Sequence, residues 1–368
     1  MGFGELIGNE AAVRHLREAI AAGRVSPSLL LAGPRGVGKY TLALMLAQAI
    51  NCLNQPSTDG LPDFCGTCAN CVRIGQAYDL DARIAEAIAA REELRETDKK
   101  ETRILVQTHP SVLVIPPDPP QLLIKMGQVR TLIREIYRKP AEARRSVFIF
   151  TSSAFMKEAA NSLLKVLEEP PDYALIVLMA ENTGELMPTI RSRTSLVRLG
   201  AVPSEQIELL LATRRSDLKP TERKLVARLS EGAVGRALGF DLAGYFDSRK
   251  DALEILRYAL GQNDHSTLFR MTESYRAGAE GQQKTVGMIR AMRSLLEDLL
   301  LLQSEAGSLV RNLDLAVELT KIAQQINLDW IERAARGLNQ VETGMRRNLL
   351  RSVALDAFAS EIASPLTR

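Results

Sequence analysis

The stretch LLLAGPRGVGKYTLALMLAQ, from Leu29 to Gln48, decides how the rest of this 368-residue chain is interpreted. An apolar run ends at a glycine, a glycine-rich loop ending in a lysine comes next, and an apolar pattern with helical spacing follows. The segment GPRGVGK, from Gly33 to Lys39, fits G-x-x-x-x-G-K between a strand and a helix, which is the context that this motif requires. The sequence therefore predicts a phosphate-binding loop at a helix N-terminus.

The residues of this loop have different predicted roles. Three glycines let backbone N–H groups turn toward phosphates: Gly33, Gly36 and Gly38. Lys39 would reach the β- and γ-phosphates. The next position usually supplies a small hydroxyl to Mg²⁺, but here it is Tyr40, whose phenol oxygen lies too far out on a rigid ring. Thr41 comes one residue late and, on a helix, points about 100° away. Tyr40 and Thr41 are thus candidate nucleotide contacts that do not anchor magnesium.

A hydrolytic site also needs carboxylates for the metal and for the attacking water, at the end of a neighbouring strand. The candidate strand is SVFIF, residues 146–150, and the residues after it run from Thr151 to Phe155 without an acid. The first acid is Glu158, which falls inside the next predicted helix. We therefore expect that the chain binds ATP or ADP without turning it over.

All four cysteines lie within one short segment, at positions Cys52, Cys65, Cys68 and Cys71. The spacing C-x12-C-x2-C-x2-C suits a single tetrahedral zinc ion, with two tight turns that direct three thiolates at one point. Two disulfides are disfavoured in a reducing cytoplasm, and free thiols are the remaining alternative. No fourth position is left open for a substrate, so the predicted zinc is structural.

Composition sets broad limits on the class of protein. Hydrophobic residues make up 46% and charged residues 25% of the chain, as in ordinary globular proteins. No apolar run is long enough to span a bilayer, and the N-terminus has no pattern of a secretory signal, so we expect a cytoplasmic protein without membrane contact. The formal net charge of +3 does not argue for nucleic-acid binding by itself.

The order of patterns along the chain predicts its organisation. Up to residue 200, short apolar runs alternate with amphipathic helices, which is typical of a parallel sheet with helices on its faces. The charged stretch 79–103 interrupts this order, and we interpret it as a solvated helical insert; a partner-binding role is the alternative. Residues 201–243 are helical, and five amphipathic stretches within 244–368 predict a separate α-helical domain.

Two further segments identify a family resemblance. EAANSLLKVLEEPP (158–171) and PTIRSR (188–193), together with cysteines inserted after the phosphate-loop helix, resemble bacterial clamp-loader subunits of the AAA+ superfamily, which belong to DNA polymerase III holoenzyme. The degraded nucleotide site is similar to that of delta-prime subunits rather than of the gamma/tau motor. The resemblance implies an α/β AAA+ P-loop domain (1–200) with an inserted zinc knuckle (52–71), a small helical lid (201–243) and an α-helical collar (244–368).

The resemblance also implies roles for single residues of the nucleotide site. Ile7 and Gly8 match the position that contacts adenine. Asn182, after the apolar run 174–180, matches the sensor-1 position. Arg236, within GAVGRAL, matches the sensor-2 arginine of the lid.

Ser192 and Arg193 match the first two residues of the family's Ser-Arg-Cys motif, with Thr194 in place of the cysteine. In the family this arginine reaches into the ATP site of the neighbouring subunit. Arg193 is therefore the candidate catalytic residue, acting in trans as an arginine finger. The alternative is that Arg193 makes only a surface salt bridge. Glu168 and Glu169 end a helix, and we assign them no catalytic role.

The function implied is that of a non-hydrolysing stator subunit, which helps load the sliding clamp on primer-template DNA during replication. Its partners would be the gamma/tau and delta subunits, the sliding clamp and, through the assembled complex, DNA. One alternative is an ATP-hydrolysing gamma/tau-like motor with an unusual magnesium site; the missing acids and the absence of a long C-terminal extension weigh against it. A second is an AAA+ repair or recombination factor that uses no clamp.

Overall fold

A six-stranded sheet organises the N-terminal part of the computed structural model, which describes residues 2–262, 264–275, 278–346 and 350–363. The strand order is β4-β5-β6-β7-β1-β8, and every neighbouring pair is parallel except β4 with β5. The strands are β1 (Ser28–Ala32), β4 (Val106–His109), β5 (Val112–Ile115), β6 (Ser146–Phe150), β7 (Ala174–Ala180) and β8 (Ser195–Arg198). The predicted parallel α/β sheet is confirmed for β5, β6, β7, β1 and β8, and the antiparallel edge strand β4 departs from that prediction.

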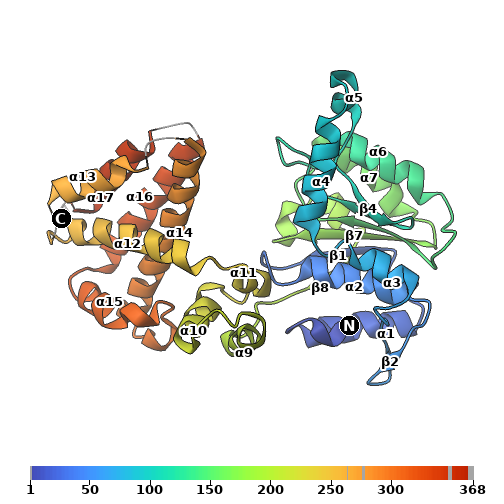
Figure 1. Ribbon diagram of the computed structural model, residues 1–368, viewed down its shortest axis with the longest axis horizontal. Helices are drawn as coiled ribbons and strands as arrows, with labels where there is room; N and C mark the ends of the chain where they lie inside the picture. The colour runs from blue at the N-terminus through green and yellow to red at the C-terminus, as the bar shows by residue number, and fades with distance from the viewer. Residues whose placement is uncertain (1, 263, 276–277, 347–349, 364–368) are drawn as a thin grey trace. The chain divides into compact units, whose positions relative to one another are not determined.

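Helices cover both faces of this sheet (Figure 1). Successive residues of the buried strands alternate between two apolar clusters: Leu29 and Leu31 belong to the cluster on one face, and Leu30 to the cluster on the other. Both faces of a central parallel strand are thus buried, which explains why these strands are continuous apolar runs. The first cluster includes α1 (Glu10–Ala21), α2 (Lys39–Asn51) and α3 (Ala69–Gly75), and the second includes α6 (Met126–Ile136), α7 (Lys157–Glu168) and α8 (Pro188–Arg191).

The remaining short elements of this unit are η1 (Phe3–Glu5), η2 (Thr183–Glu185) and a two-stranded hairpin of β2 (Ser57–Thr58) and β3 (Leu61–Pro62). The hairpin lies inside the cysteine segment and is fixed to α1 by one side chain. Buried Arg17 donates hydrogen bonds to the carbonyls of Thr58, Leu61 (2.8 Å) and Pro62 (2.9 Å). Backbone oxygens therefore hold this buried guanidinium.

Most of the remaining chain forms a second compact unit. The first unit takes in residues up to Ile207 together with Gly232–Arg236, and the second takes in Glu208–Glu231 and the residues after Arg236. The helices from this region are α9 (Ser204–Arg214), α10 (Pro220–Leu229), α11 (Val234–Leu238), α12 (Leu242–Ala259), α13 (His265–Glu273), α14 (Gly278–Gln303), α15 (Ala316–Ala323), α16 (Leu328–Arg346) and α17 (Arg351–Ala363), with short η3 (Gly307–Leu309) and η4 (Leu313–Leu315).

Helices α12, α14, α16 and α17 pack into one apolar core in the second unit (Figure 1). Trp330 contributes to this core, and its indole N–H donates to the carbonyl of Ile362 at 2.8 Å. Helices α12, α14, α15, α16 and α17 fall within the five expected stretches, of which residues 347–349 lie outside the described part of the chain, and α13 is an additional helix that the apolar pattern did not reveal. Among the described helices, none combines the length and the apolar character that a bilayer-spanning segment requires.

The charged insert at 79–103 forms two helices rather than one, α4 (Leu80–Glu92) and α5 (Glu96–Glu101). Leu80 and Ile84 rest on the core cluster, and the other side of α4 is exposed. Arg91, in the last turn of α4, donates to Oδ1 of Asp118 at 2.9 Å, while Nζ of Lys125 lies 2.9 Å from Oδ2 without hydrogen-bond geometry. Because Asp118 is 0% exposed, this pairing is the buried anchor of the insert.

Replacement of this buried carboxylate tests the anchor. Asp118→Asn keeps the size of the side chain but leaves two shielded cations unpaired, which typically costs about 3 kcal/mol or more. Amide hydrogen exchange over α4 and α5 should therefore become faster. The control is Glu86→Gln, which removes a 59% exposed partner of Arg83 and should leave exchange unchanged. Equal exchange in the two variants would show that the buried pairing does not hold the insert.

Candidate functional site

The predicted phosphate loop joins β1 to α2, with a left-handed backbone at its glycines. Gly36 and Gly38 have φ values of 86° and 97°, which glycine adopts without strain. A Cβ at Gly33, where φ is 155°, would lie 2.1 Å from the carbonyl oxygen of Leu199, so no larger residue fits there. The loop leads directly into α2, whose first N–H groups are the donors that such a loop offers to an anion.

Lys39 is half-buried at the start of α2. Its Nζ donates to the carbonyl oxygens of Gly33 at 2.5 Å and Pro34 at 2.8 Å. Burial lowers the pKa of Lys39 below its ordinary value, and the carboxylates of Glu181 and Glu185 oppose that shift. The lysine thus lies in the loop itself, within the electrostatic range of two acids that follow β7.

The side chain of Tyr40 is held by other contacts and does not take the place of the small hydroxyl that usually follows the lysine. Its phenol O–H donates to the carbonyl oxygen of Ala77 at 2.6 Å, and its ring packs against the core cluster. Burial raises the pKa of Tyr40 well above its ordinary value, so the phenol stays protonated. Thr41 follows it on α2 and is half-buried. The hydroxyl that replaces the usual magnesium ligand is therefore committed to a backbone carbonyl.

The carboxyl end of β6 lies next to that of β7 because the two strands are parallel neighbours. Here Ser153 donates its hydroxyl to the carboxylate of Glu185. The same carboxylate accepts the backbone N–H groups of Glu181 (3.3 Å) and Asn182 (3.1 Å). Sequence reasoning missed this acid because it comes from the neighbouring strand; the Asn-x-x-Glu pattern of a capping box was its only signal.

The other predicted nucleotide residues lie around the loop. Asn182 accepts the N–H of Gly184 at 2.9 Å and so caps η2. A Cβ at Gly36 would lie 3.3 Å from the backbone nitrogen of Arg236, and the adjacent Gly235 N–H donates to the carbonyl of Gly36 at 2.8 Å. The segment carrying Arg236 therefore contacts the phosphate loop directly.

The N-terminal segment reaches the loop from another side. A side-chain methyl of Leu6 lies 3.0 Å from the position of a Cβ at Gly38. Ile7 is half-buried, and Gly8 is buried with a φ of 70° against Val202. The structure thus brings together the segments that carry Ile7, the phosphate loop and Arg236.

The four cysteines converge on one point. Their sulfur atoms all lie within 4.8 Å of one another, with Cys52 and Cys71 buried and Cys65 and Cys68 half-buried. Backbone N–H groups face the sulfurs: Cys65 N–H donates to Cys52 at 3.4 Å, and Cys68 N–H donates to Cys65 at 3.3 Å. Burial opposes ionisation of Cys65, yet hydrogen bonds from the backbone N–H groups of Cys68 and Thr67 lower its pKa to about 6. Four sulfurs in this arrangement can hold a metal ion.

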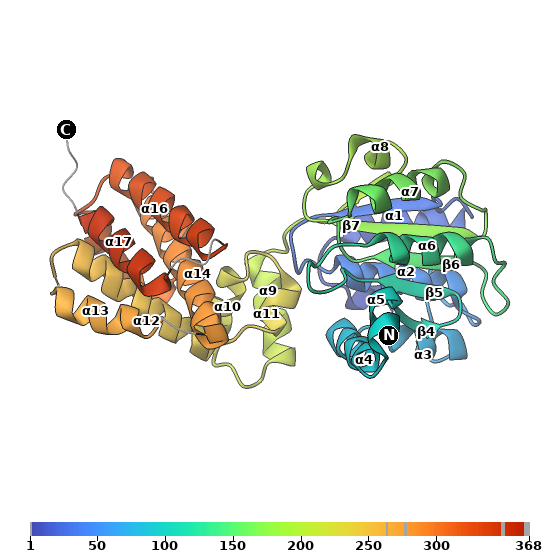
Figure 2. The ribbon, with the colours of Figure 1, turned by 90° about the horizontal axis from the view of Figure 1, so that it is seen from above.

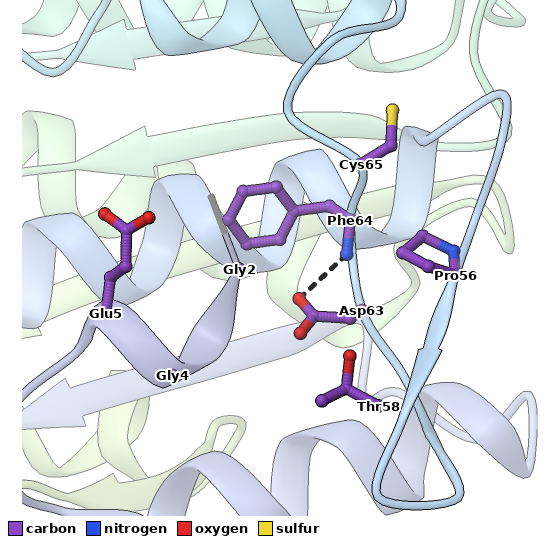
Figure 3. Close-up of a pocket in the computed structure, with 8 residues that line it drawn as sticks. All are labelled: Gly2, Gly4, Glu5, Pro56, Thr58, Asp63, Phe64 and Cys65. Carbon is purple, nitrogen blue, oxygen red and sulfur yellow. Dashed lines mark hydrogen bonds between the residues drawn. The ribbon is translucent and has the colours of Figure 1, made fainter.

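A shallow cavity of about 540 Å³ lies beside this cluster (Figure 3). Its walls come from the N-terminal segment and the β2–β3 region: Gly2, Gly4, Glu5, Pro56, Thr58, Asp63, Phe64 and Cys65. The carboxylate of Asp63 accepts the N–H groups of Phe3 at 3.0 Å and Phe64 at 2.8 Å, which ties the two segments together. None of these lining residues belongs to the phosphate loop, so the cavity is separate from the predicted nucleotide site.

Arg193 is exposed in the turn after α8. Its Nη1 donates to the carbonyl of Thr189 at 2.9 Å, and its Nη2 lies 2.7 Å from Oε1 of Glu168 at the end of α7. The adjacent Thr194, where the family motif has cysteine, donates its hydroxyl to the carbonyl of Arg191 at 3.0 Å. The candidate arginine finger is therefore a side chain with defined contacts on the surface of the first unit.

A family model described as DNA polymerase III, delta subunit, matches residues 8–203, more than half of the chain. The chain belongs to this family. The matched range covers the sheet, the phosphate loop, the cysteine cluster and Arg193. The resemblance to clamp-loader proteins of the AAA+ class is thereby confirmed, whereas the delta-prime type within that class is not decided by the match.

Relatives that match this chain in sequence are named as gamma/tau or tau subunits of DNA polymerase III. A DNA polymerase III subunit gamma/tau from Mycobacterium tuberculosis is 28% identical over 211 residues, covering 57% of this chain and 30% of the relative. The DNA polymerase III subunit tau of Escherichia coli is 25% identical over 361 residues, covering 95% of this chain and 48% of the relative. The chain thus spans less than half the length of these relatives.

Among solved structures, a DNA polymerase III gamma subunit-related protein from Thermotoga maritima has a TM-score of 0.42 at 15% identity, covering 95% of this chain and 98% of the other. The RuvB Holliday junction branch migration motor of the same organism has a TM-score of 0.39 at 17% identity, covering 87% and 88%.

Proposed function

We propose that this protein is a delta-prime-type stator subunit of the DNA polymerase III clamp loader, one that does not hydrolyse ATP itself. It would join gamma/tau and delta subunits in the cytoplasm, help load the sliding clamp on primer-template DNA, and complete a neighbour's ATPase site with Arg193. Family membership supports a place in the clamp loader, and the state of the phosphate loop supports the stator role.

The hydrogen bond from Tyr40 to Ala77 is the observation that carries this proposal. A hydroxyl that ligates magnesium must face the phosphates, whereas this one donates to the carbonyl of Ala77, in the segment between α3 and α4. Its high pKa also keeps it from becoming a phenolate that could bind a cation. A magnesium ion beside the loop would therefore lack its usual protein anchor.

Glu185 does not restore the missing acid in this proposal. Its carboxylate already accepts a serine hydroxyl and two backbone N–H groups. These three donated hydrogen bonds hold the carboxylate in one position. A residue with these bonds would have to break them before it could bind a metal or polarise water. Glu185 therefore supports the architecture of the loop surroundings rather than hydrolysis.

Nucleotide binding without turnover fits the parts that remain. The glycines and Lys39 would bind phosphates of ATP or ADP, Ile7 and Gly8 would contact the base, and Asn182 and Arg236 would reach toward the phosphate end. Tyr40 and Thr41 would border the bound nucleotide without chemistry. Such a nucleotide would stabilise the contact between the phosphate loop and the segment around Arg236, by binding the folded arrangement preferentially.

Arg193 would supply the catalytic group that this chain does not use for itself. A guanidinium is planar and permanently charged, so it can stabilise negative charge that develops on a transferred γ-phosphoryl group. Its exposure on the surface of the first unit makes it accessible to a neighbouring subunit. The subunit would thus act on ATP held by another chain.

The cysteine cluster is proposed to hold one structural zinc ion. Four thiolates within mutual reach satisfy a tetrahedral ion, and zinc prefers such sulfur ligands. The ion would fix the end of α2 to α3, since Cys52 follows α2 directly and Cys71 lies on α3. Its contribution is to folding, because metal binding free energy adds to the stability of the folded segment.

The gamma/tau-like motor is the alternative function, and the relatives' names favour it. It requires that Tyr40 leave Ala77, or that magnesium bind without this position. The two functions differ in whether the isolated chain turns over ATP.

Metal analysis tests the zinc proposal. The purified chain should contain one zinc per molecule, and Cys68→Ser should reduce this content and lower the melting temperature, because the ion then loses one of four ligands. Val72→Ala is the matched control, since this neighbouring side chain on α3 is 48% exposed. Wild-type protein that contains no zinc and keeps its melting temperature in chelator would contradict a structural metal.

A reconstituted clamp loader tests the function of Arg193. With Arg193→Ala in this subunit, hydrolysis at the ATP site that it completes should fall about 10³-fold, as when other arginine fingers are removed. The total ATP turnover of the complex should then fall by the fraction that this one site contributes, while assembly of the complex is unchanged. Lys157→Ala, at the start of α7, serves as a surface control for lost positive charge. Wild-type turnover with Arg193→Ala would refute the proposed role in trans.

A further inference from the structure

The contacts of Arg193 define where its guanidinium lies before any partner is present. Its Nη2 is 2.7 Å from Oε1 of Glu168, and its Nη1 donates to the carbonyl of Thr189 at 2.9 Å and to the hydroxyl of Ser192 at 3.3 Å. A guanidinium carries five N–H donors. These three contacts leave the Nε–H and a second Nη2–H to donate to another anion.

Glu168 is placed at this point by the way in which α7 ends. It is the last residue of the helix, Glu169 has a non-helical backbone (φ −135°, ψ 66°), and two prolines follow. Proline cannot continue a helix, so the two prolines make α7 end at Glu168. Helix α8, which precedes Arg193, lies against α7 (Figure 2).

The carboxylate is also at the unfavourable end of its helix. The C-terminus of a helix carries partial negative charge, so an acid in the last turn is destabilised unless a cation compensates it. Arg193 is that cation. The negative charge of Glu168 is therefore compensated by Arg193, the residue that is proposed to act in trans.

Stability alone does not account for the pair. The side chain of Arg193 is 35% exposed and that of Glu168 is 50% exposed. Solvent screens such exposed pairs, so their contribution to the free energy of unfolding is small. The pair matters more for the conformation of Arg193. This long side chain has many rotamers, and its contacts with the carboxylate of Glu168 and the carbonyl of Thr189 restrict it to one orientation.

We propose that Glu168 is a positioning residue for Arg193, holding the guanidinium ready so that its remaining donors engage the γ-phosphoryl group of ATP in the neighbouring subunit. This inference rests on the proposed role of Arg193 in trans. Glu168 touches neither nucleotide nor water in this scheme. It acts by lowering the conformational entropy that Arg193 loses when the transition state forms.

The test uses the reconstituted loader and the Arg193-dependent part of its turnover, defined as the difference between wild type and Arg193→Ala. Glu168→Gln keeps the size of the side chain and removes its charge. Ordering a long side chain costs about 0.5–1.5 kcal/mol, so the Arg193-dependent kcat should fall about two- to tenfold. The KM for ATP should not change, because the nucleotide is bound by the neighbouring subunit's own loop. Glu169→Gln, one residue further along, is the matched control and should behave as wild type.

A double variant separates positioning from a general structural effect. Glu168→Gln should have no further effect in the Arg193→Ala background if it acts only through the arginine. Unchanged or increased Arg193-dependent turnover in Glu168→Gln would overturn the inference and leave the proposed function intact. An equal loss in the Arg193→Ala background would overturn it as well, because the role would then be structural. If Arg193→Ala itself has no effect, the proposed function fails first, and the inference with it.

Discussion

Parallel pairing of β6, β7 and β1 is the constraint on which the candidate site depends. Parallel neighbours end at the same edge of a sheet, so the phosphate loop after β1, Asn182 after β7 and Ser153 after β6 meet there although they are far apart in sequence. The register of β1 on β7 fixes this edge to within one residue. The bond between Ser153 and Glu185 is a direct consequence, because it joins the loops that follow two neighbouring strands.

A second set of contacts explains why the loop carries a tyrosine. Helix α2 begins beside the phosphate loop and ends at Cys52, so both of its ends are tied to functional segments. Gln48 donates to the carbonyl of Cys71 at 2.8 Å and accepts the hydroxyl of Tyr78 at 2.7 Å, while Tyr40 donates to Ala77. The helix is thus fastened along its length to the segment that follows the cysteines. Tyr40 is one of these packing contacts and not a ligand of the loop.

Much of the fold could be predicted from apolar patterns, and the failures have identifiable causes. The runs around Leu30, Val114, Ile149 and Val177 were recognisable because both faces of these strands are buried. Strand β8 was missed because only Val197 among its residues is buried, so its pattern resembles a loop. Strand β4, on the antiparallel edge of the sheet, buries only its two end residues, Val106 and His109, so it has no continuous apolar run. The break between α4 and α5 lacks glycine and proline, and no local signal marks it.

The site was predictable where chemistry requires a fixed spacing and not where it depends on tertiary contacts. The glycines, Lys39 and the cysteines follow motifs with a physical reason for each interval. Nothing near Tyr40 in the sequence reveals that its hydroxyl binds Ala77, and nothing near Arg193 reveals Glu168, because each pair is brought together by the packing of separate elements.

The most direct test of the central claim is magnesium-dependent ATP hydrolysis by the isolated chain, measured as phosphate release beside Lys39→Ala. A phosphate loop whose hydroxyl position is committed to a backbone carbonyl should release no more phosphate than this variant, at any magnesium concentration. Magnesium-dependent turnover that disappears in Lys39→Ala would contradict the account and make this subunit a motor.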